Sequence, residues 1–377
     1  MNLAFVVPGF AAAEKDWCIP AHTEIVRALA AEHDVHVFTL RYPHRADTYR
    51  IGNATVHSFG GADVRGIATA QLWQRVAREI AREHARNAFD VIHAIFGGEA
   101  GCLAVLSGKF LRAPSVVWLV NGELVGLREI GYGAALNAPL RWMNEIVLRY
   151  ADSILCGCEA MVASAEARVD ETRRARVELL PLGVDTTRFN PSPPAPLRKG
   201  NGASQFVNVG SLLPVKDQAT LLRAFALVRR EMPDAHLTIA GTGPLENALR
   251  ALAADLQIDS CVTFAGNVPY EKLPALCRSA DVFVQASRHE GQGMALLEAA
   301  ACGCAVCGTK VGALRDLARR DAAIAAAVGD TAALADAMQY AFAERARLSA
   351  QSQQITDREY NLKHIAKRLV ALYAHLI

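Results

Sequence analysis

Short apolar runs rich in β-branched residues alternate along this chain with longer stretches whose apolar residues recur at helical spacing. Such alternation predicts strand–helix units around parallel sheets, because strands buried on both faces read as nearly continuous apolar runs. Helical spacing is clear over residues 70–85 and 140–150. The strands expected in the first half are residues 3–7, 35–40, 91–95, 115–120, 153–156 and 177–180.

A proline-rich segment interrupts this pattern. Residues 191–196 read Pro-Ser-Pro-Pro-Ala-Pro, and a stretch with charged residues, glycine and serine follows up to residue 204. Neither a core helix nor a central strand tolerates this composition. The alternation then restarts, with expected strands at residues 206–209, 237–240, 261–264, 281–285 and 305–307.

The length of 377 residues exceeds what one ordinary hydrophobic core accommodates. We therefore expect an α/β protein of two Rossmann-like, doubly wound domains that face each other across a cleft. The first domain covers residues 1–190, a linker covers 191–204, and the second domain covers 205–355. Residues 356–377 carry apolar side chains on one face and are expected to form a closing helix that returns toward the first domain.

Charge and hydropathy exclude several classes of protein. Lys and Arg number 40 against 38 Asp and Glu, so no strongly basic face for nucleic acid is expected. No apolar stretch approaches the roughly 18 residues of a membrane span, and residues 1–7 lack the positive flank of a signal peptide. We expect a cytoplasmic protein. The basic stretch 168–176 is the candidate for peripheral contact with the inner face of a membrane, although its acidic residues favour a solvated surface.

Nine cysteines are present, and several lie in apolar surroundings. The spacings within residues 302–307 and 156–158 do not repeat the paired spacing of zinc fingers or ribbons. We therefore interpret the cysteines as reduced core residues, and no metal site is expected.

The densest functional signal lies between residues 287 and 303. A strand ends there, a loop with Gly291 and Gly293 follows, and a helix begins near Met294 and ends at Gly303. Backbone N–H groups of such a loop, together with the helix N-terminus, suit a phosphate or a developing oxyanion. Glu290 precedes the helix and Glu298 lies within its otherwise apolar sequence, where an acid is costly unless paired or bound. The alternative is a tight turn followed by a solvated glutamate.

Two glutamates separated by seven residues, ahead of a Cys-Gly helix end, resemble the retaining glycosyltransferases of family 4 (glycosyl transferases group 1). The resemblance implies a GT-B fold and spans nearly the whole second half of the chain. Its other marks are residues 209–217 (VGSLLPVKD), 239–244 (IAGTGP), 264–269 (FAGNVP), 280–284 (ADVFV) and 311–316 (VGALRD).

This resemblance implies roles for individual residues. Lys216 would neutralise the donor diphosphate, while Ser211 stands where the family usually has Arg. Glu290 and His93 are the catalytic candidates, with His93 placed at a strand end; a hydrogen-bonded core histidine is the alternative for His93. Asn121 and Glu123 are the acceptor-side candidates. The donor-binding candidates are Gly9, Ser211, Lys216, Gly241, Asn267, Gly291, Gln292, Gly293, Met294 and Glu298.

The resemblance thus predicts transfer of a sugar from a nucleotide-diphosphate sugar to a sugar, lipid or small-molecule acceptor, with retention of configuration and no cofactor. The sequence contains no Asp-x-Asp pair to hold a divalent ion, so we expect metal-independent turnover. A nucleotide-sugar epimerase and a noncatalytic sugar-nucleotide binding module remain alternatives. A nicotinamide-dependent oxidoreductase is disfavoured, because the glycines at 241 and 243 form an incomplete dinucleotide fingerprint.

Overall fold

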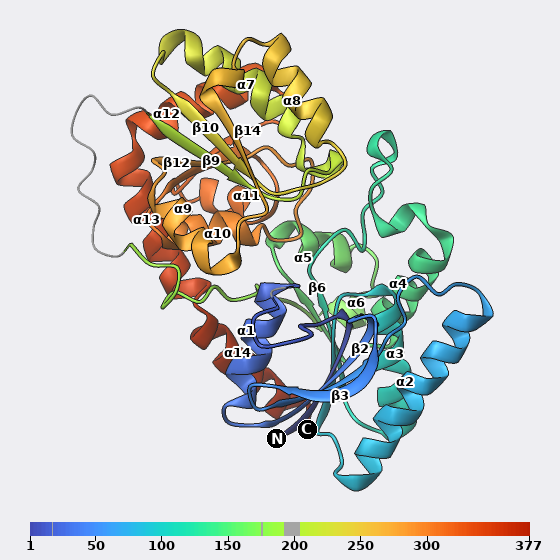
Figure 1. The fold of residues 1–377 in the computed structure, drawn as a ribbon. Helices are drawn as coiled ribbons and strands as arrows, with labels where there is room; N and C mark the ends of the chain where they lie inside the picture. Colours follow the sequence, from blue (N-terminus) through green and yellow to red (C-terminus); the bar gives the residue numbers. More distant parts are fainter. Residues whose placement is uncertain (17, 175, 192–203) are drawn as a thin grey trace. The chain divides into compact units, whose positions relative to one another are not determined.

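The computed structural model describes residues 1–16, 18–174, 176–191 and 204–377. These residues divide into two compact units, shown in Figure 1. Unit 1 comprises Met1–Gly183 together with Leu362–Ile377, and unit 2 comprises Val184–Asn361. The predicted linker lies outside the described residues except at its two ends.

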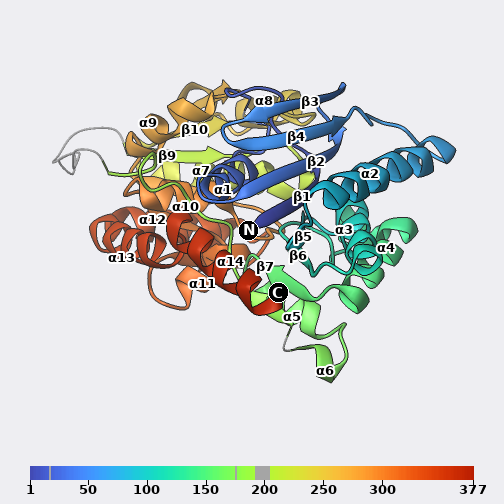
Figure 2. The ribbon, with the colours of Figure 1, turned by 90° about the horizontal axis from the view of Figure 1, so that it is seen from below.

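Unit 1 is built on a sheet with the strand order β3-β4-β2-β1-β5-β6-β7-β8. Neighbouring strands run parallel, except that β3 pairs with β4 in the antiparallel sense. Figure 2 shows β3, β4, β2 and β1 side by side. The strands are β1 (Asn2–Gly9), β2 (Asp34–Tyr42), β3 (Ala46–Ile51), β4 (Ala54–Phe59), β5 (Val91–Ile95), β6 (Ser115–Leu119), β7 (Ser153–Cys156) and β8 (Val177–Leu179).

Helices cover both faces of this sheet. Helices α1 (Pro20–Ala30) and α14 (Leu362–Leu376) pack against each other on one face. Apolar residues of α2 (Ile67–Arg86) and α3 (Gly98–Leu111) join the core of the other face, and α4 (Ala138–Tyr150) packs on α3. The shorter elements are α5 (Glu159–Glu166), α6 (Glu171–Arg174), η1 (Arg128–Ile130) and η2 (Ala134–Leu136).

Unit 2 has a parallel sheet with the strand order β11-β10-β9-β12-β13-β14. Its strands are β9 (Gln205–Val209), β10 (His236–Ala240), β11 (Val262–Gly266), β12 (Val282–Gln285), β13 (Ala305–Thr309) and β14 (Ile324–Ala326). The remaining elements are α7 (Gln218–Glu231), α8 (Glu246–Asp255), α9 (Leu273–Arg278), α10 (Met294–Ala301), α11 (Gly312–Ala318), α12 (Thr331–Ala343), α13 (Arg345–Glu359), η3 (Pro214–Lys216), η4 (Asp259–Cys261) and η5 (Tyr270–Lys272).

The structure differs from the sequence analysis in several places, and one of them is β14, a strand that the sequence analysis did not expect. No strand was expected between residues 40 and 91, yet β3 and β4 form a hairpin there; β3 is an exposed, polar edge strand without an apolar pattern. The predicted domain boundary follows residue 190, whereas the compact units divide after Gly183. The predicted closing helix begins at residue 356, whereas α13 continues to Glu359 and α14 begins at Leu362.

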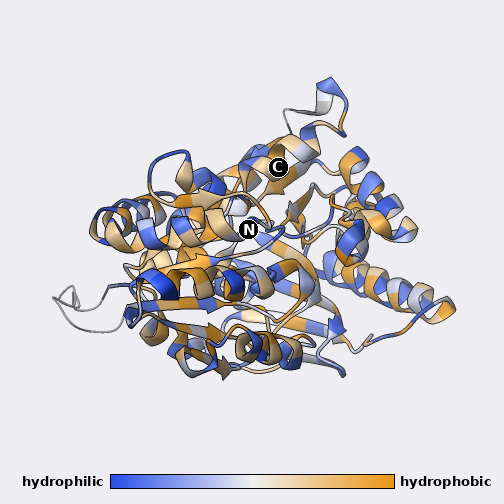
Figure 3. Cartoon of the chain, turned by 90° about the horizontal axis from the view of Figure 1, so that it is seen from above, coloured by the Kyte–Doolittle hydropathy of each residue, from blue (hydrophilic) through white to orange (hydrophobic). Residues whose placement is uncertain are grey.

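Hydrophobic residues concentrate in the central strands, while the outer helices carry both hydrophobic and hydrophilic residues, as Figure 3 shows. This is the pattern of amphipathic helices on a buried sheet. Among the described residues, we find no helix with the length and apolar character needed to cross a bilayer.

Candidate active site

The strand order of unit 2 reverses between β9 and β12, since β10 and β11 follow on one side of β9 and β12 to β14 on the other. In open parallel sheets, ligands bind beyond the carboxyl ends of the strands at such a switch point. The segments that leave β9 and β12 at this end are residues 210–217 and 286–293. They contain Lys216 and Glu290, respectively.

Three bonds hold these two segments together. The Lys216 Nζ atom donates to Glu290 Oε1 at 2.7 Å. Arg288 donates through its backbone N–H to the Val215 carbonyl at 2.8 Å and through Nε to Asp217 Oδ2 at 3.0 Å. The two loops at the switch point are therefore bonded to each other, and their charged side chains are held in a fixed arrangement.

Glu290 is positioned from a second side as well. The Ser287 hydroxyl donates to the same Glu290 oxygen at 2.6 Å, and only 12% of the Glu290 side chain is exposed, against 28% for Lys216. A carboxylate oxygen that accepts from two donors is held in a fixed orientation. Lys216 is the more accessible member of the pair.

The loop before α10 has the geometry expected from its glycines. Gly293 caps α10 with φ +96°, and a Cβ atom there would lie 2.8 Å from Gln285 Oε1. Gly291 and Gln292 are buried, and the Gln292 carbonyl accepts from the Ala313 N–H at 2.7 Å. Met294 is the first residue of α10. The N–H groups of this first turn have no partner within the helix, so they are available to an anion.

Glu298 lies inside α10 and is buried, as the apolar surroundings in the sequence indicated. The Tyr270 hydroxyl donates to its Oε1 at 3.2 Å, and the Arg188 guanidinium lies 5.0 Å from the centre of the Tyr270 ring. Burial raises the pKa of Glu298 to about 7, although Tyr270 and Arg188 oppose the shift. A solvated helix glutamate is thereby excluded.

The other predicted donor residues lie at the same edge of the sheet with different surroundings. Gly241 has φ +143°, and a Cβ atom would lie 2.0 Å from the Gly210 carbonyl oxygen, so glycine is required for the packing of two adjacent loops. Ser211 and Asn267 are exposed. Their side chains are accessible, but neither has the fixed geometry of Lys216.

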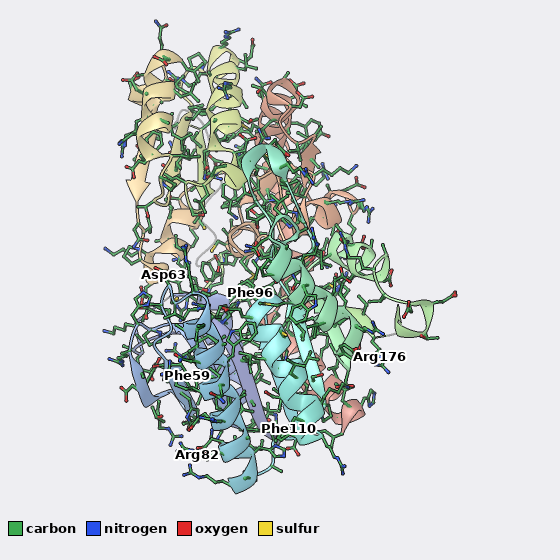
Figure 4. The ribbon with its side chains drawn as sticks, turned by 90° about the vertical axis from the view of Figure 1, so that its right-hand side faces the viewer. Phe59, Asp63, Arg82, Phe96, Phe110 and Arg176 are labelled. Carbon is green, nitrogen blue, oxygen red and sulfur yellow. The ribbon has the colours of Figure 1, made fainter. Side chains whose placement is uncertain are left out.

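His93 requires a correction. It is the third residue of the five-residue strand β5, not its last, and is 1% exposed. Its ring stacks on Phe5 at 4.9 Å, and its Nδ1 atom lies 2.5 Å from the Tyr373 hydroxyl of α14. Burial lowers the pKa of His93 to about 3, which keeps the imidazole neutral. The surroundings of His93 are therefore those of a hydrogen-bonded core histidine. The residue that directly follows the carboxyl end of β5 is Phe96, which Figure 4 labels.

The acceptor-side candidates lie in the loop after β6. Glu123 is buried, and its two carboxylate oxygens accept from the Val120 N–H at 3.2 Å and the Asn121 N–H at 2.8 Å. Gly97, in the loop after β5, also donates a backbone hydrogen bond to this carboxylate, so Glu123 stabilises the backbone of two neighbouring loops. Asn121 is exposed and its Oδ1 accepts from a tyrosine hydroxyl at 2.6 Å. Gly9 ends β1 and is buried.

The sequence analysis did not assign roles to Ser287, Arg288, Tyr270 or Arg188. Ser287 and Arg288 belong to the glycine-bearing motif itself, so their proximity to Glu290 gave a usable signal. Tyr270 and Arg188 are far from Glu298 along the chain, and only the fold brings them to it.

Two family models match the sequence, one for each half. Residues 23–188 match the model of Glycosyltransferase Family 4, and residues 193–358 match that of Glycosyl transferases group 1. The chain belongs to the family 4 glycosyltransferases. The family assignment made from the motifs is confirmed.

The matches to similar proteins extend over different lengths of this chain. It is 40% identical over 141 residues to the GDP-mannose-dependent alpha-(1-6)-phosphatidylinositol monomannoside mannosyltransferase of Mycolicibacterium smegmatis, a match that covers 34% of this chain and 37% of that protein. The match thus spans little more than a third of the relative's length.

Two solved structures share the fold over the whole chain. Sucrose-phosphate synthase from Thermosynechococcus elongatus has a TM-score of 0.79 at 20% identity, covering 100% of this chain and 99% of that one. Anabaena HepE in complex with UDP has a TM-score of 0.75 at 16% identity, covering 100% of both chains. The predicted GT-B class with two Rossmann-like domains is confirmed.

Proposed function

We propose that this glycosyltransferase moves a sugar from a nucleotide-diphosphate sugar to an acceptor, and that the donor binds at the switch point of unit 2. The Lys216–Glu290 ion pair, formed there between two loops and followed by the N-terminus of α10, is the observation that carries the proposal. One cation and one helix N-terminus suit a diphosphate, and a carboxylate beside them suits sugar hydroxyls.

Lys216 is assigned to the diphosphate. An ammonium group has three N–H donors, so Lys216 can bind a phosphate oxygen while Glu290 still accepts from it and orients it. Charge then develops on the leaving diphosphate beside a cation that is already in position. Because the family's usual Arg is replaced by Ser211, Lys216 carries most of this task.

The two glutamates receive different roles. Glu290, held by Lys216 and Ser287, is assigned to the transferred sugar. Glu298 is assigned to hydroxyls of the ribose, because a buried carboxylate with a raised pKa gains from added donors. Donor binding should therefore favour the ionised form of Glu298.

We further propose retention of the anomeric configuration and turnover without a metal ion or cofactor. The GDP-mannose-dependent mannosyltransferase of Mycolicibacterium smegmatis supports a nucleotide-sugar donor and a sugar- or lipid-linked acceptor, and HepE in complex with UDP supports a nucleoside diphosphate. A cytoplasmic location with contact to the inner face of a membrane stays a prediction.

A transfer assay tests the proposal. The full chain is incubated with nucleotide sugars of several bases and with free and lipid-linked sugar acceptors, and proton NMR follows the first-formed product. Release of nucleoside diphosphate with a product of retained configuration is expected. Conversion of the donor without acceptor would indicate an epimerase, and binding without turnover would indicate a noncatalytic module.

The metal requirement is measured in the same assay. Turnover should persist in chelator and should not rise on addition of magnesium or manganese, at a temperature well below the Tm. Activity that is lost in chelator and restored by either ion would contradict metal independence.

A further inference from the structure

A group of potential metal ligands lies in unit 1, where α2 covers the sheet. His57 of β4 and Glu79 and Glu83 of α2 each present one ligand atom, and these atoms all lie within 4.8 Å of one another. The His57 Nδ1 atom is 3.6 Å from Glu79 Oε1. The two glutamates are four residues apart, so they occupy the same face of the helix.

His57 is oriented toward the two glutamates by its other ring nitrogen. Its Nε2 atom is 3.0 Å from His36 Nδ1, and His36 Nε2 lies 3.7 Å from an oxygen of Asp34. The ring also stacks on Phe38 with centroids 4.8 Å apart. His57 is 5% exposed, and its Nδ1 atom has no hydrogen-bond partner among the described residues. A buried, unpartnered nitrogen directed at two carboxylates forms a set of ligand atoms that suits a cation.

We propose that His57 Nδ1, Glu79 and Glu83 bind a first-row divalent cation, for which Zn²⁺ is the probe. Imidazole nitrogen and carboxylate oxygen are both accepted ligands of zinc. The hydrogen bond from His57 Nε2–H to His36 would fix the tautomer that leaves Nδ1 free for the metal, as partners behind a ligand commonly do. Glu79 is 20% exposed, so water can complete the coordination.

Two arginines compete with the cation. Arg82 is bonded to Glu79, and Arg86 donates to Glu83 at 2.7 Å. Both side chains are more than half exposed, and Figure 4 labels Arg82 on α2. They can leave the carboxylates without losing buried contacts. Their charge lowers the affinity for a cation, so removing them should strengthen it.

The site would connect α2 to β4, next to the edge strand of the sheet. Such a link adds stability to unit 1. It takes no part in the proposed sugar transfer, for which Lys216, Glu290 and Glu298 of unit 2 are assigned to the donor.

The test uses the full chain with Cys18→Ser, because Cys18 is the exposed cysteine among the described residues and its thiol also binds zinc. Titration calorimetry with ZnCl₂ should give one site per chain, and saturating Zn²⁺ should raise the Tm. Glu79→Gln changes a partly exposed side chain and should abolish both effects while circular dichroism stays native. His36→Phe should weaken binding by about 10- to 100-fold.

Matched variants complete the experiment. His44→Asn removes an exposed histidine of the same unit and should leave zinc binding unchanged. Arg82→Ala with Arg86→Ala should tighten it. Co²⁺ in place of Zn²⁺ should give a visible d–d absorption that Glu79→Gln removes. Absence of a zinc site, or equal binding in the parent chain, Glu79→Gln and Glu83→Gln, would overturn the proposal.

Discussion

The carboxyl edges of the two sheets differ in what their polar residues bond to. In unit 2, Lys216 and Glu290 come from different loops and pair across the switch point. In unit 1, Glu123 accepts from backbone N–H groups of the loops after β5 and β6, and His93 packs within the core. Polar groups that bond to backbone N–H groups stabilise a fold. Charges that meet from separate loops at a strand-order reversal indicate a ligand site.

Loss of Lys216 tests this difference most severely. A charge-assisted bond to phosphate contributes about 1.5 to 3 kcal/mol, so Lys216→Met should lower turnover and donor affinity by about 10- to 100-fold. Ser211→Arg in the same background should restore part of the affinity, since a guanidinium can bind phosphate in bidentate fashion. The matched control is Lys367→Met, at an exposed lysine of α14. Equal losses of turnover and donor affinity in both variants would contradict the assignment of Lys216 to the diphosphate.

Glu290→Gln tests the second residue of the ion pair in unit 2. The amide keeps the size of the side chain but loses the charge that attracts Lys216 and the sugar hydroxyls. Turnover should fall by about 10-fold or more, with nucleoside diphosphate affinity little changed. Steady-state kinetics and calorimetry separate the two quantities. A loss of nucleotide affinity with unchanged turnover would contradict the assignment.

His93 tests whether the polar residues of unit 1 stabilise the fold. His93→Phe leaves the Tyr373 hydroxyl without its buried partner and should cost about 1 to 3 kcal/mol of unfolding free energy. Adding Tyr373→Phe should recover part of that loss. Turnover per folded molecule should stay near wild type, measured beside urea unfolding.

The pH dependence of stability provides a further check on His93. The folded pKa is about 3, against 6.5 for the ordinary group. Stability should be full above pH 6.5 and fall as the pH decreases toward 3, because the unfolded chain binds a proton that the folded chain excludes. The slope should be shallower in His93→Phe. A folded variant as inactive as Lys216→Met would instead make His93 a group of the active site.

Glu298 gives the smallest expected effect. Its folded pKa of about 7 lies above the ordinary value of 4.5, so unliganded stability should fall as pH rises from 4.5 to 7, where the unfolded chain has lost the proton that the folded chain keeps. Nucleoside diphosphate binding should tighten a few-fold as Glu298 ionises above pH 7.

Calorimetry on either side of pH 7 measures this change. Glu298→Gln serves as the reference, because its profile lacks the titration of Glu298. Identical profiles and affinities in wild type and Glu298→Gln would remove the ribose assignment.

Sequence patterns predicted most of the parallel strands, because buried strands are apolar and regularly spaced. They also predicted the loop at Gly293 and the burial of Glu298. Strand β3 of the hairpin escaped prediction because an exposed edge strand needs no apolar pattern. The turn at Gly52, with φ +55°, was the available signal.

The predicted position of His93 at a strand end was wrong for a different reason. Side chains alternate between the faces of a strand, and the sequence does not tell which face a helix such as α14 covers. The contacts of Glu298 with Tyr270 and Arg188 depend on tertiary structure in the same way.

A thermal-shift screen tests the central claim most directly. Wild type and Lys216→Met are each heated with UDP, GDP and ADP and with the corresponding nucleotide sugars. Binding to the folded state raises the Tm, so at least one nucleoside diphosphate should stabilise wild type and should stabilise Lys216→Met clearly less. No shift with any nucleotide, or equal shifts in the two proteins, would contradict a donor site built around Lys216.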